Sequence, residues 1–211
     1  MKIAIVGAGN VGGALAKQWG KKGHALTIGV KNVQDQQYQN LVREIGPNAS
    51  VGTVADAVHS ADIVVLATPW SAVESAIAQS GSLAGKVLID CTNPLKPDLS
   101  GLTVGHDTSG AEMVQRLANG ARVCKAFNTV GANIMANPIL EGRKVAMYYC
   151  GDDQAAKEKV HALIQDVGFE PIDLGPLASA RFLEPMAMVW ILSAMKYGQG
   201  RDQALGLLRV K

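Results

Sequence analysis

The sequence predicts an α/β fold built on a doubly wound, mostly parallel β-sheet, with a small helical extension at the C-terminus. Apolar runs alternate with amphipathic segments along the chain, beginning with residues 2–6, 10–22, 25–29 and 35–45. The apolar runs are nearly continuous, which is typical of strands that are buried on both faces of a sheet. A glycine-rich turn joins the first run to the first amphipathic segment, as expected of a βαβ unit.

The same rhythm continues toward the end of the chain. We expect further strands at residues 63–67, 87–90, 122–127, 145–150 and 170–173, and helices at residues 71–79, 111–117, 154–167 and 178–195. Asp152 or Asp153 is the expected N-cap of the helix at 154–167, because a carboxylate there can accept hydrogen bonds from free backbone N–H groups. The last helix is apolar on most sides, so we expect it to be buried or packed on a second copy in a homodimer.

Composition and charge exclude several classes of protein. The 211 residues include 20 basic and 18 acidic side chains, and the basic residues are scattered, so we expect no nucleic-acid partner. The first apolar stretch is too short for the core of a signal peptide. The uncharged stretch at residues 185–195 is shorter than the roughly 20 residues needed to span a bilayer. We therefore expect a cytoplasmic protein without a membrane partner.

Cysteine usage points the same way. Cys91, Cys124 and Cys150 are odd in number, widely spaced and set in apolar runs. This pattern favours buried free thiols over a disulfide framework or a zinc site. We expect no bound metal and a reducing compartment.

The glycine-rich turn has the G-x-G-x-x-G pattern of a dinucleotide-binding site, in the strand-to-helix context that the pattern requires. Gly7 permits the tight turn, Gly9 lets the backbone approach a pyrophosphate, and Gly12 lets the helix pack closely on the strand. Free N–H groups at the start of the helix favour phosphate. The expected cofactor-binding residues of the turn are Gly7, Ala8, Gly9, Asn10, Val11 and Gly12.

The motif sets the expected domain organisation. Residues 1–174 are predicted to form an NADP-binding, Rossmann-like domain. Residues 175–211 are predicted to add a helical segment that completes the cleft, and the two parts are expected to form a single compact unit.

The end of the second predicted strand indicates NADP rather than NAD. Chains of this type that bind NAD normally carry an acid at this point, which accepts hydrogen bonds from the ribose hydroxyls. This chain instead has Lys31 and Asn32, and no carboxylate occurs before Asp35. An ammonium group and an amide suit a 2′-phosphate. The alternative is that Lys31 only solvates a loop.

Short polar side chains follow three later predicted strands. Ligands of open α/β sheets bind outside the carboxyl ends of the strands, so we expect these side chains to contact the nicotinamide and its ribose. The candidates are Thr68, Pro69 and Trp70 after the fourth strand, Thr92 and Asn93 after the fifth, and Asn128 and Thr129 after the sixth. Turn formation is the alternative for each, and for Asn93, which precedes a proline, it weighs as much as a functional role.

No catalytic acid or base is assigned from the sequence. No His, Lys or Tyr stands in an evident acid/base pairing after these strands, and His106 in the long loop is interpreted as solvated, with a substrate contact as the alternative. Reduction of a carbonyl would need a proton donor. Hydride transfer between two ring cofactors depends mainly on the alignment of the rings and is compatible with this sequence.

The chain resembles the NADP-dependent oxidoreductases of coenzyme F420, an 8-hydroxy-5-deazaflavin, over essentially its whole length. The resemblance is carried by residues 3–12, 66–70, 90–94, 125–129, 150–153 and 183–186. It implies that F420 or a flavin (FMN or FAD) stacks on the nicotinamide in a cleft lined by Thr92, Asn93, Ala126, Phe127, Asn128 and Thr129, with Ala126 also a cofactor contact. One departure is Lys31, where the family often has an arginine, because lysine binds phosphate as a point charge rather than bidentately.

We therefore predict an enzyme that transfers a hydride between NADP(H) and a deazaflavin or flavin. Two alternatives stay open. One is an NADPH-dependent reductase of a small carbonyl or imine, although those families add a larger helical C-terminal domain. The other is a non-catalytic NADP-binding sensor.

Overall fold

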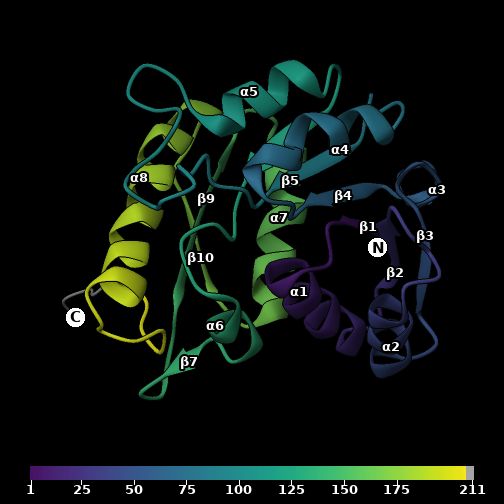
Figure 1. Cartoon of the computed structure of the whole chain (residues 1–211), viewed down its shortest axis with the longest axis horizontal. Coiled ribbons are helices and arrows are strands. Elements are labelled where there is room, and N and C mark those ends of the chain that lie inside the picture. Colours follow the sequence, from purple (N-terminus) through teal and green to yellow (C-terminus); the bar gives the residue numbers. More distant parts are fainter. Residues whose placement is uncertain (208–211) are drawn as a thin grey trace.

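The centre of the molecule is a single large β-sheet (Figure 1). The computed structural model describes residues 1–207. The strands of the sheet are β1 (Lys2–Val6), β2 (Ala25–Val30), β3 (Ala49–Thr53), β4 (Ile63–Leu66), β5 (Val87–Asp90), β6 (Arg122–Lys125), β9 (Ala146–Gly151) and β10 (Glu170–Asp173). Their order is β10-β9-β6-β5-β4-β1-β2-β3, and all pairings are parallel except β6 with β9. The predicted doubly wound, mostly parallel sheet is thus confirmed.

Helices cover both faces of this sheet. They are α1 (Asn10–Lys21), α2 (Gln36–Ile45), α3 (Val54–Ser60), α4 (Val73–Gln79), α5 (Gly110–Leu117), α6 (Ala132–Ala136), α7 (Gln154–Val167) and α8 (Ala180–Ile191). Short helical turns are η1 (Trp70–Ala72), η2 (Leu177–Ser179) and the π-turn η3 (Leu192–Lys196), and a separate hairpin is formed by β7 (Ile139–Leu140) and β8 (Arg143–Lys144). Asp153 caps α7 through a 2.7 Å hydrogen bond from the Ala156 N–H, as one of the two predicted caps.

Alternation along each strand divides the core into two layers. In β1, Ile3 and Ile5 face the layer that contains α1, α2, α6 and α7, whereas Ala4 and Val6 face the layer that contains α3, α4, α5 and the start of α8. Successive side chains of a strand point to opposite faces, so a sheet buried on both sides needs apolar residues at every position. This requirement explains the continuous apolar runs in the sequence.

The main differences between the predicted and observed elements lie in three parts of the chain. The predicted strand at 122–127 ends at Lys125, because Phe127 has φ 63° and turns the chain out of the sheet. The predicted helix at 178–195 is divided into η2, α8 and η3. No bounds were predicted for β3 and α3, since β3 is a half-exposed strand with little apolar character.

The C-terminal helix lies at the opposite side of the molecule from α2 and β3 (Figure 1). Its inner side packs Leu183 and Ala187 into the core, while Phe182 and Val189 are 74% and 56% exposed. The run Leu177–Lys196, with 20 residues and a mean hydropathy of 1.2, is long and apolar enough to cross a membrane by length and composition alone, a test that buried core helices also pass. Residues 208–211 of the predicted C-terminal segment lie outside the described residues.

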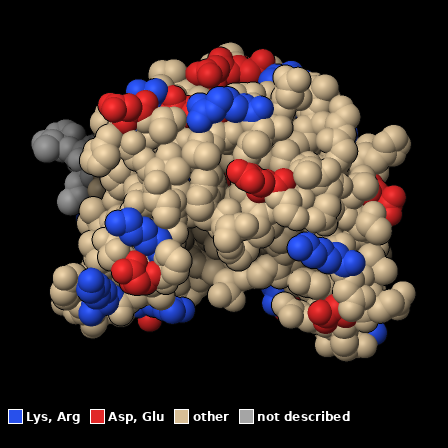
Figure 2. All heavy atoms as spheres, turned by 45° about the horizontal axis from the view of Figure 1, so that its top comes forward, with Lys and Arg blue, Asp and Glu red and all other residues tan. Residues whose placement is uncertain are grey.

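Charge is distributed without a dominant sign on the face shown in Figure 2, where basic and acidic side chains are interspersed. The same face is hollowed between two lobes at its lower edge.

Candidate functional site

The glycine turn lies at the carboxyl end of β1, beside β4, where the strand order of the sheet reverses. Gly7 has φ 91°, and a Cβ there would come within 2.8 Å of the Ala67 carbonyl oxygen. A Cβ on Gly12 would lie 2.1 Å from the Gly7 carbonyl oxygen, whereas a Cβ on Gly9 would meet no atom within 4 Å. Packing within the chain therefore requires glycine at positions 7 and 12, but it does not explain glycine at position 9.

A cavity of about 320 Å³ opens on one side of this turn. It brings together four predicted cofactor-binding residues from the ends of β1, β2 and β4, namely Gly7, Lys31, Asn32 and Thr68. Lys31 is exposed and has no ion-pair or hydrogen-bond partner among residues 1–207 through its side chain. The side-chain oxygen of Asn32 accepts a hydrogen bond from the Gln34 N–H, so this residue also shapes the turn.

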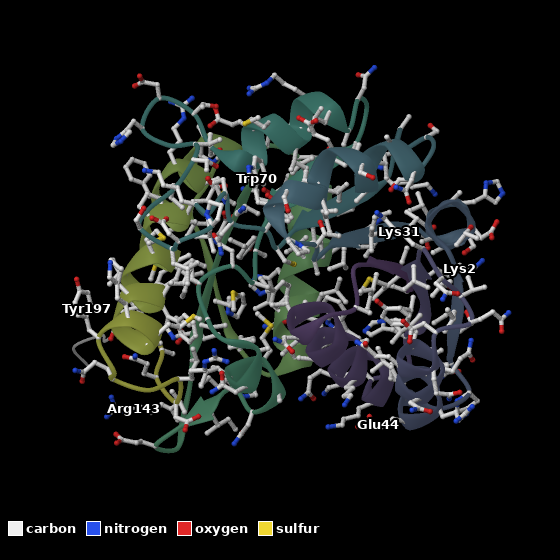
Figure 3. All side chains as sticks on the ribbon, in the orientation of Figure 1. Lys2, Lys31, Glu44, Trp70, Arg143 and Tyr197 are labelled. Carbon is white, nitrogen blue, oxygen red and sulfur yellow. The ribbon has the colours of Figure 1, made fainter. Side chains whose placement is uncertain are left out.

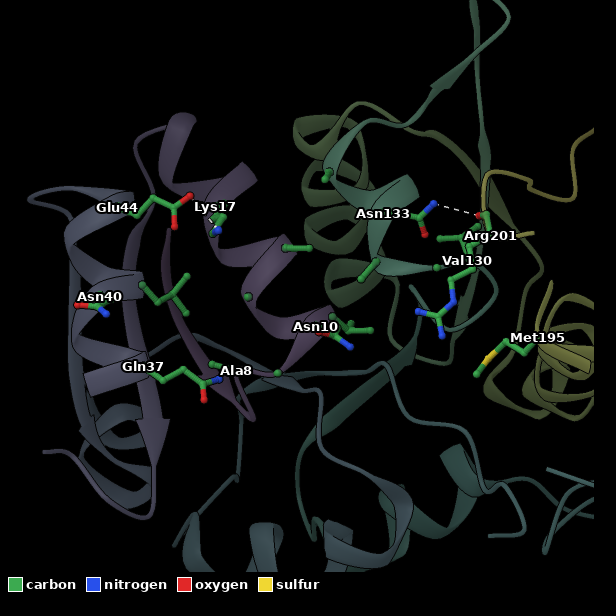
Figure 4. Close-up of a pocket in the computed structure, with 18 of the residues that line it drawn as sticks. Ala8, Asn10, Lys17, Gln37, Asn40, Glu44, Val130, Asn133, Met195 and Arg201 are labelled. Atoms are coloured by element: carbon green, nitrogen blue, oxygen red, sulfur yellow. Dashed lines mark hydrogen bonds and ion pairs between the residues drawn. The ribbon is translucent and has the colours of Figure 1, made fainter. Parts of the chain in front are cut away.

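A second cavity, of about 920 Å³, lies along the outer side of α1 (Figure 4). Four residues of the glycine motif line it, Ala8, Gly9, Asn10 and Val11. Its other walls come from α2, from the loop and helix around α6, and from the C-terminal segment. Gly9 is the N-cap of α1, no side chain caps that end of the helix, and its first turn holds no acid. The free N–H groups of α1 are therefore available to an anion in this cavity.

Asn93 and Asn128, which follow β5 and β6, form a hydrogen-bonded pair that joins the ends of these two strands to α8. Asn93 Nδ2 donates to the Asn128 carbonyl oxygen at 2.9 Å. Asn128 Nδ2 donates to Asn93 Oδ1 and to the Leu183 carbonyl oxygen, each at 3.0 Å. This arrangement supports a structural role for Asn93, and it fixes the position of the loop that follows β6.

Three buried polar atoms near the strand ends have no hydrogen-bond partner among the described residues. They are Thr68 Oγ1, Asn128 Oδ1 and Thr129 Oγ1, and the only further such atom in residues 1–207 is Thr108 Oγ1. A buried polar atom without a partner costs about 1–3 kcal/mol, so native structures rarely retain one without a ligand, water or functional reason. The chemistry of these atoms fits the hydroxyl and amide groups of a nicotinamide nucleoside.

Other predicted residues are placed differently. Ala126 and Phe127 are 0% and 1% exposed, and the Phe127 ring packs edge-on against Trp19, so their side chains belong to the core. Trp70 packs with the layer of α5 and α8, away from Lys31 (Figure 3). Neither Pro69 nor Trp70 is among the residues that line the two cavities, and the same holds for the six predicted cleft residues Thr92, Asn93, Ala126, Phe127, Asn128 and Thr129.

A buried charge cluster behind the strand ends is the main feature that the sequence analysis missed. The ammonium of Lys125, at the end of β6, lies 2.9 Å from both Asp90 Oδ2 and Glu184 Oε1, and all three side chains are at most 1% exposed. Burial alone lowers the pKa of Lys125, but the attraction of Asp90 and Glu184 outweighs it, so the net pKa is raised and the lysine stays charged. Glu184 also accepts from the N–H groups of Gly110 and Ala111.

The partners of Lys125 are distant in sequence, so no local spacing signals the cluster. Thr92 completes it, donating its hydroxyl to Asp90 Oδ1 and offering its carbonyl oxygen to Lys125. The one available signal was the occurrence of Asp90, Lys125 and Glu184 in otherwise apolar segments. Charged side chains in such segments are buried only when they are paired, so their presence indicates a buried ion pair.

Comparison with known proteins identifies the family. The profile described as "NADP oxidoreductase coenzyme F420-dependent" matches residues 2–94. The crystal structure of a "putative f420 dependent nadp-reductase" from Arthrobacter sp. FB24 is 31% identical, covers 99% of this chain and 100% of that chain, and superimposes with a TM-score of 0.88. The chain belongs to the family of coenzyme F420-dependent NADP oxidoreductases.

Other proteins are similar to this F420-dependent oxidoreductase in sequence or in fold. A hypothetical protein from Sinorhizobium meliloti is 27% identical over 100% of this chain and 96% of that chain, with a TM-score of 0.78. Metalloreductase STEAP3 of Rattus norvegicus is 30% identical over 191 residues, 89% of this chain, which spans only 36% of that relative's length. A reductive aminase of Aspergillus terreus in complex with NADPH, 23% identical over 93% of this chain and 62% of that chain, shares the fold with a TM-score of 0.69.

Proposed function

We propose that this NADP-dependent oxidoreductase transfers a hydride between NADP(H) and a deazaflavin of the F420 type, with FMN or FAD as the alternative acceptor. The observation that carries the proposal is the end-to-end likeness to the Arthrobacter reductase, with 31% identity and complete coverage of that chain. A likeness that covers 99% of this chain extends beyond the nucleotide-binding half to the C-terminal helix.

Each part of NADP(H) has a matching group on the chain. Backbone N–H groups from Ala8 to Val11 would receive the diphosphate, and Lys31 with Asn32 would receive the 2′-phosphate in the smaller cavity. The unpartnered atoms of Thr68, Asn128 and Thr129 would bond the nicotinamide and its ribose. Open space at Gly9 then has a reason, because a side chain there would occupy the path of the diphosphate. The participation of Pro69 and Trp70 remains a prediction.

Alignment of two rings is the main catalytic task in this proposal. NADP(H) supplies or accepts the hydride, and the chain holds the reacting partners in contact while excluding water. At the ends of β5 and β6 the charged groups are committed to one another, since Lys125 forms ion pairs with both Asp90 and Glu184. The Asn93–Asn128 pair and its bond to Leu183 hold the loop after β6 against α8. These interactions suit a positioning role rather than proton transfer.

Reduction of a metal ion is a second candidate function. It is favoured by the 30% identity to Metalloreductase STEAP3 over 89% of this chain. The described residues contain no group of three or more His, Cys, Asp or Glu that could hold a metal ion. For this second function, the metal ion would be the final electron acceptor, held in solution or by a partner protein. A flavin would carry the electrons from NADPH to it.

We extend the proposal to the organisation of the protein. Residues 1–174 form the cofactor-binding part and the segment from residue 175 completes the cleft. The exposed apolar side chains of α8, led by Phe182 and Val189, supply a homodimer interface. The three buried free thiols are those expected in a reducing cytoplasm. Light scattering of the purified protein tests the dimer, with Phe182→Ser as the variant expected to weaken it.

Stopped-flow measurement of NADPH oxidation tests the function. Purified protein is mixed with NADPH and, separately, with oxidised F420, FMN, FAD, riboflavin, or FMN plus a ferric chelate. Rapid oxidation with F420 alone supports the deazaflavin, and rapid oxidation with FMN or FAD supports a flavin acceptor. Gly9→Ala is the matched control, because it should fold normally and lose activity. No oxidation in any mixture, with NADPH binding intact, would refute the proposal.

A further inference from the structure

A free cation from the C-terminal segment reaches the larger cavity. Arg201 lines this cavity together with Gly9 and Asn10, and Figure 4 shows its guanidinium group pointing into the cavity on the side of Asn10. The cavity's other charged lining residues, Lys17 and Glu44, form a 2.8 Å ion pair with each other. Within residues 1–207, the Arg201 guanidinium has no ion-pair partner.

The backbone that carries Arg201 is tied down by side chains from α6, α8 and η3. We call residues 197–207 the C-terminal strap. Asn133 Nδ2 donates to the Arg201 carbonyl oxygen at 3.0 Å and to Asp202 Oδ1 at 2.9 Å. Trp190 Nε1 donates to the Gln203 carbonyl oxygen at 2.8 Å, and Gln203 also bonds Ser193 and the Gly200 carbonyl oxygen. These hydrogen bonds fix the backbone on both sides of Arg201, whereas the backbone of an arginine in a free surface loop would be unrestrained.

Trp190 links the strap to the wall of the cavity. Its ring lies against Gly131, where a Cβ would come within 2.8 Å of Trp190 Cζ2. Both residues line the cavity. The indole ring therefore contacts Gly131 in the wall of the cavity, and its N–H binds the Gln203 carbonyl oxygen of the strap.

We propose that Arg201 is a cofactor-binding residue whose guanidinium closes over the diphosphate of NADP(H) bound at the start of α1. The inference rests on the proposed function, because it takes the glycine turn as the dinucleotide site. The diphosphate then lies between two positive groups, the uncapped N-terminus of the 12-residue α1 on one side and Arg201 on the other. A guanidinium suits a diphosphate because its planar array of donors can bond two oxygens at once.

This arrangement separates two tasks between two basic residues. Lys31 lies in the smaller cavity with Gly7 and Thr68, so it would distinguish NADP from NAD. Arg201 would contact a group that both cofactors contain, so it would strengthen both equally. The strap also places a wall over the cofactor that the glycine motif alone does not supply.

Isothermal titration calorimetry on the full chain tests the assignment with NADP⁺, NAD⁺ and adenosine 2′-monophosphate as the three probes. Arg201→Ala is expected to weaken NADP⁺ and NAD⁺ by the same factor, on the order of tenfold, which is the effect of losing one charge-assisted hydrogen bond at a partly exposed site. Adenosine 2′-monophosphate, which lacks the diphosphate, should bind within about twofold of wild type. The salt dependence of NADP⁺ binding should also become shallower.

Two further variants control for folding and for charge. Arg143→Ala removes another exposed arginine, on β8, and should leave all three affinities unchanged. Trp190→Phe keeps the ring beside Gly131 but removes the donor to Gln203, so it should weaken NADP⁺ less than Arg201→Ala does. Wild-type affinity for NADP⁺ in Arg201→Ala would overturn the inference while leaving the proposed function intact. Failure of the wild-type chain to bind NADP⁺ at all would overturn both.

Discussion

Replacing Lys125 with methionine should destabilise the folded protein strongly. The ammonium group is 0% exposed and lies 2.9 Å from carboxylate oxygens of both Asp90 and Glu184. Methionine has nearly the same length but no charge, so the variant would hold two buried carboxylates that face each other without a cation. The lost interaction also includes the hydrogen bond from Lys125 to the Thr92 carbonyl oxygen.

The expected size of the effect follows from what remains after the substitution. Removing one partner of a buried charge pair costs about 3–5 kcal/mol, because the charge left behind has lost its compensation. Asp90 keeps its bonds from Thr92, and Glu184 keeps those from Gly110 and Ala111. These donors reduce the cost but do not neutralise the charge, so the lower half of the range applies. For a chain of this size, the lower half of that range, about 3–4 kcal/mol, corresponds to a fall in melting temperature of about 6–16 °C.

A double-mutant cycle separates the charge effect from packing. Urea unfolding of Lys125→Met, Glu184→Gln and the double variant is followed by far-ultraviolet circular dichroism. Glu184→Gln alone leaves the balanced Lys125–Asp90 pair and should cost less than Lys125→Met. The double variant holds only one carboxylate, so its loss should be smaller than the sum of the two single losses by about 1–3 kcal/mol. A Lys125→Met variant within about 1 kcal/mol of wild type, or strictly additive losses, would show that the lysine does not neutralise the carboxylates.

Three further outcomes are expected. Lys31→Glu should weaken NADPH by about tenfold or more and leave NADH nearly unchanged in fluorescence titrations, since only NADPH carries the 2′-phosphate; equal losses for both cofactors would contradict the role of Lys31. Gly9→Ala should keep the wild-type melting temperature but bind NADPH more weakly. Gly12→Ala should lose both stability and NADPH affinity, because its Cβ would lie 2.1 Å from the Gly7 carbonyl oxygen. A lower melting temperature for Gly9→Ala would contradict the open space at that position. Burial raises the pKa of Cys124 and Cys150 to about 12 and also raises the pKa of Cys91, so the three thiols stay protonated at pH 8. The native chain should therefore not react with Ellman's reagent, whereas the denatured chain should expose three reactive thiols. Reaction of the native protein at the rate of the denatured protein would contradict the burial of these thiols.

The sheet was predictable because its signals are local. Continuous apolar runs and the strand-to-helix glycine turn determine β1, β2, β4 and β5 within one or two residues of the observed bounds. The edge strand β3 escaped because half-exposed strands lack a continuous apolar run. The end of β6 was placed two residues too late because the left-handed conformation of Phe127 has no signal in its residue type.

The candidate site was predictable only in the parts that follow strands. Gly7, Lys31, Asn32 and Thr68 meet in one cavity because the carboxyl ends of parallel strands share one edge of the sheet. Arg201 lies outside every motif of the sequence. Glu184 lies in the segment 183–186 that carries the family resemblance, but its partner Lys125 is distant in sequence, so no spacing indicated its role. Phe127 was expected in the cleft, yet its ring packs between Trp19 and Phe169 in the core.

Helix α8 connects these separate features into one structural unit. At one end, Glu184 forms an ion pair with Lys125 and holds the start of α5, while the neighbouring Leu183 carbonyl accepts from Asn128 behind β6. Near the other end, Trp190 holds the C-terminal strap. An axial shift of α8 would therefore disturb the strand-end loop and the strap together. This coupling gives a physical reason for burying a charged cluster that hydrophobic residues could have replaced: paired charges and directed hydrogen bonds specify one axial position of the helix, whereas an apolar contact tolerates several.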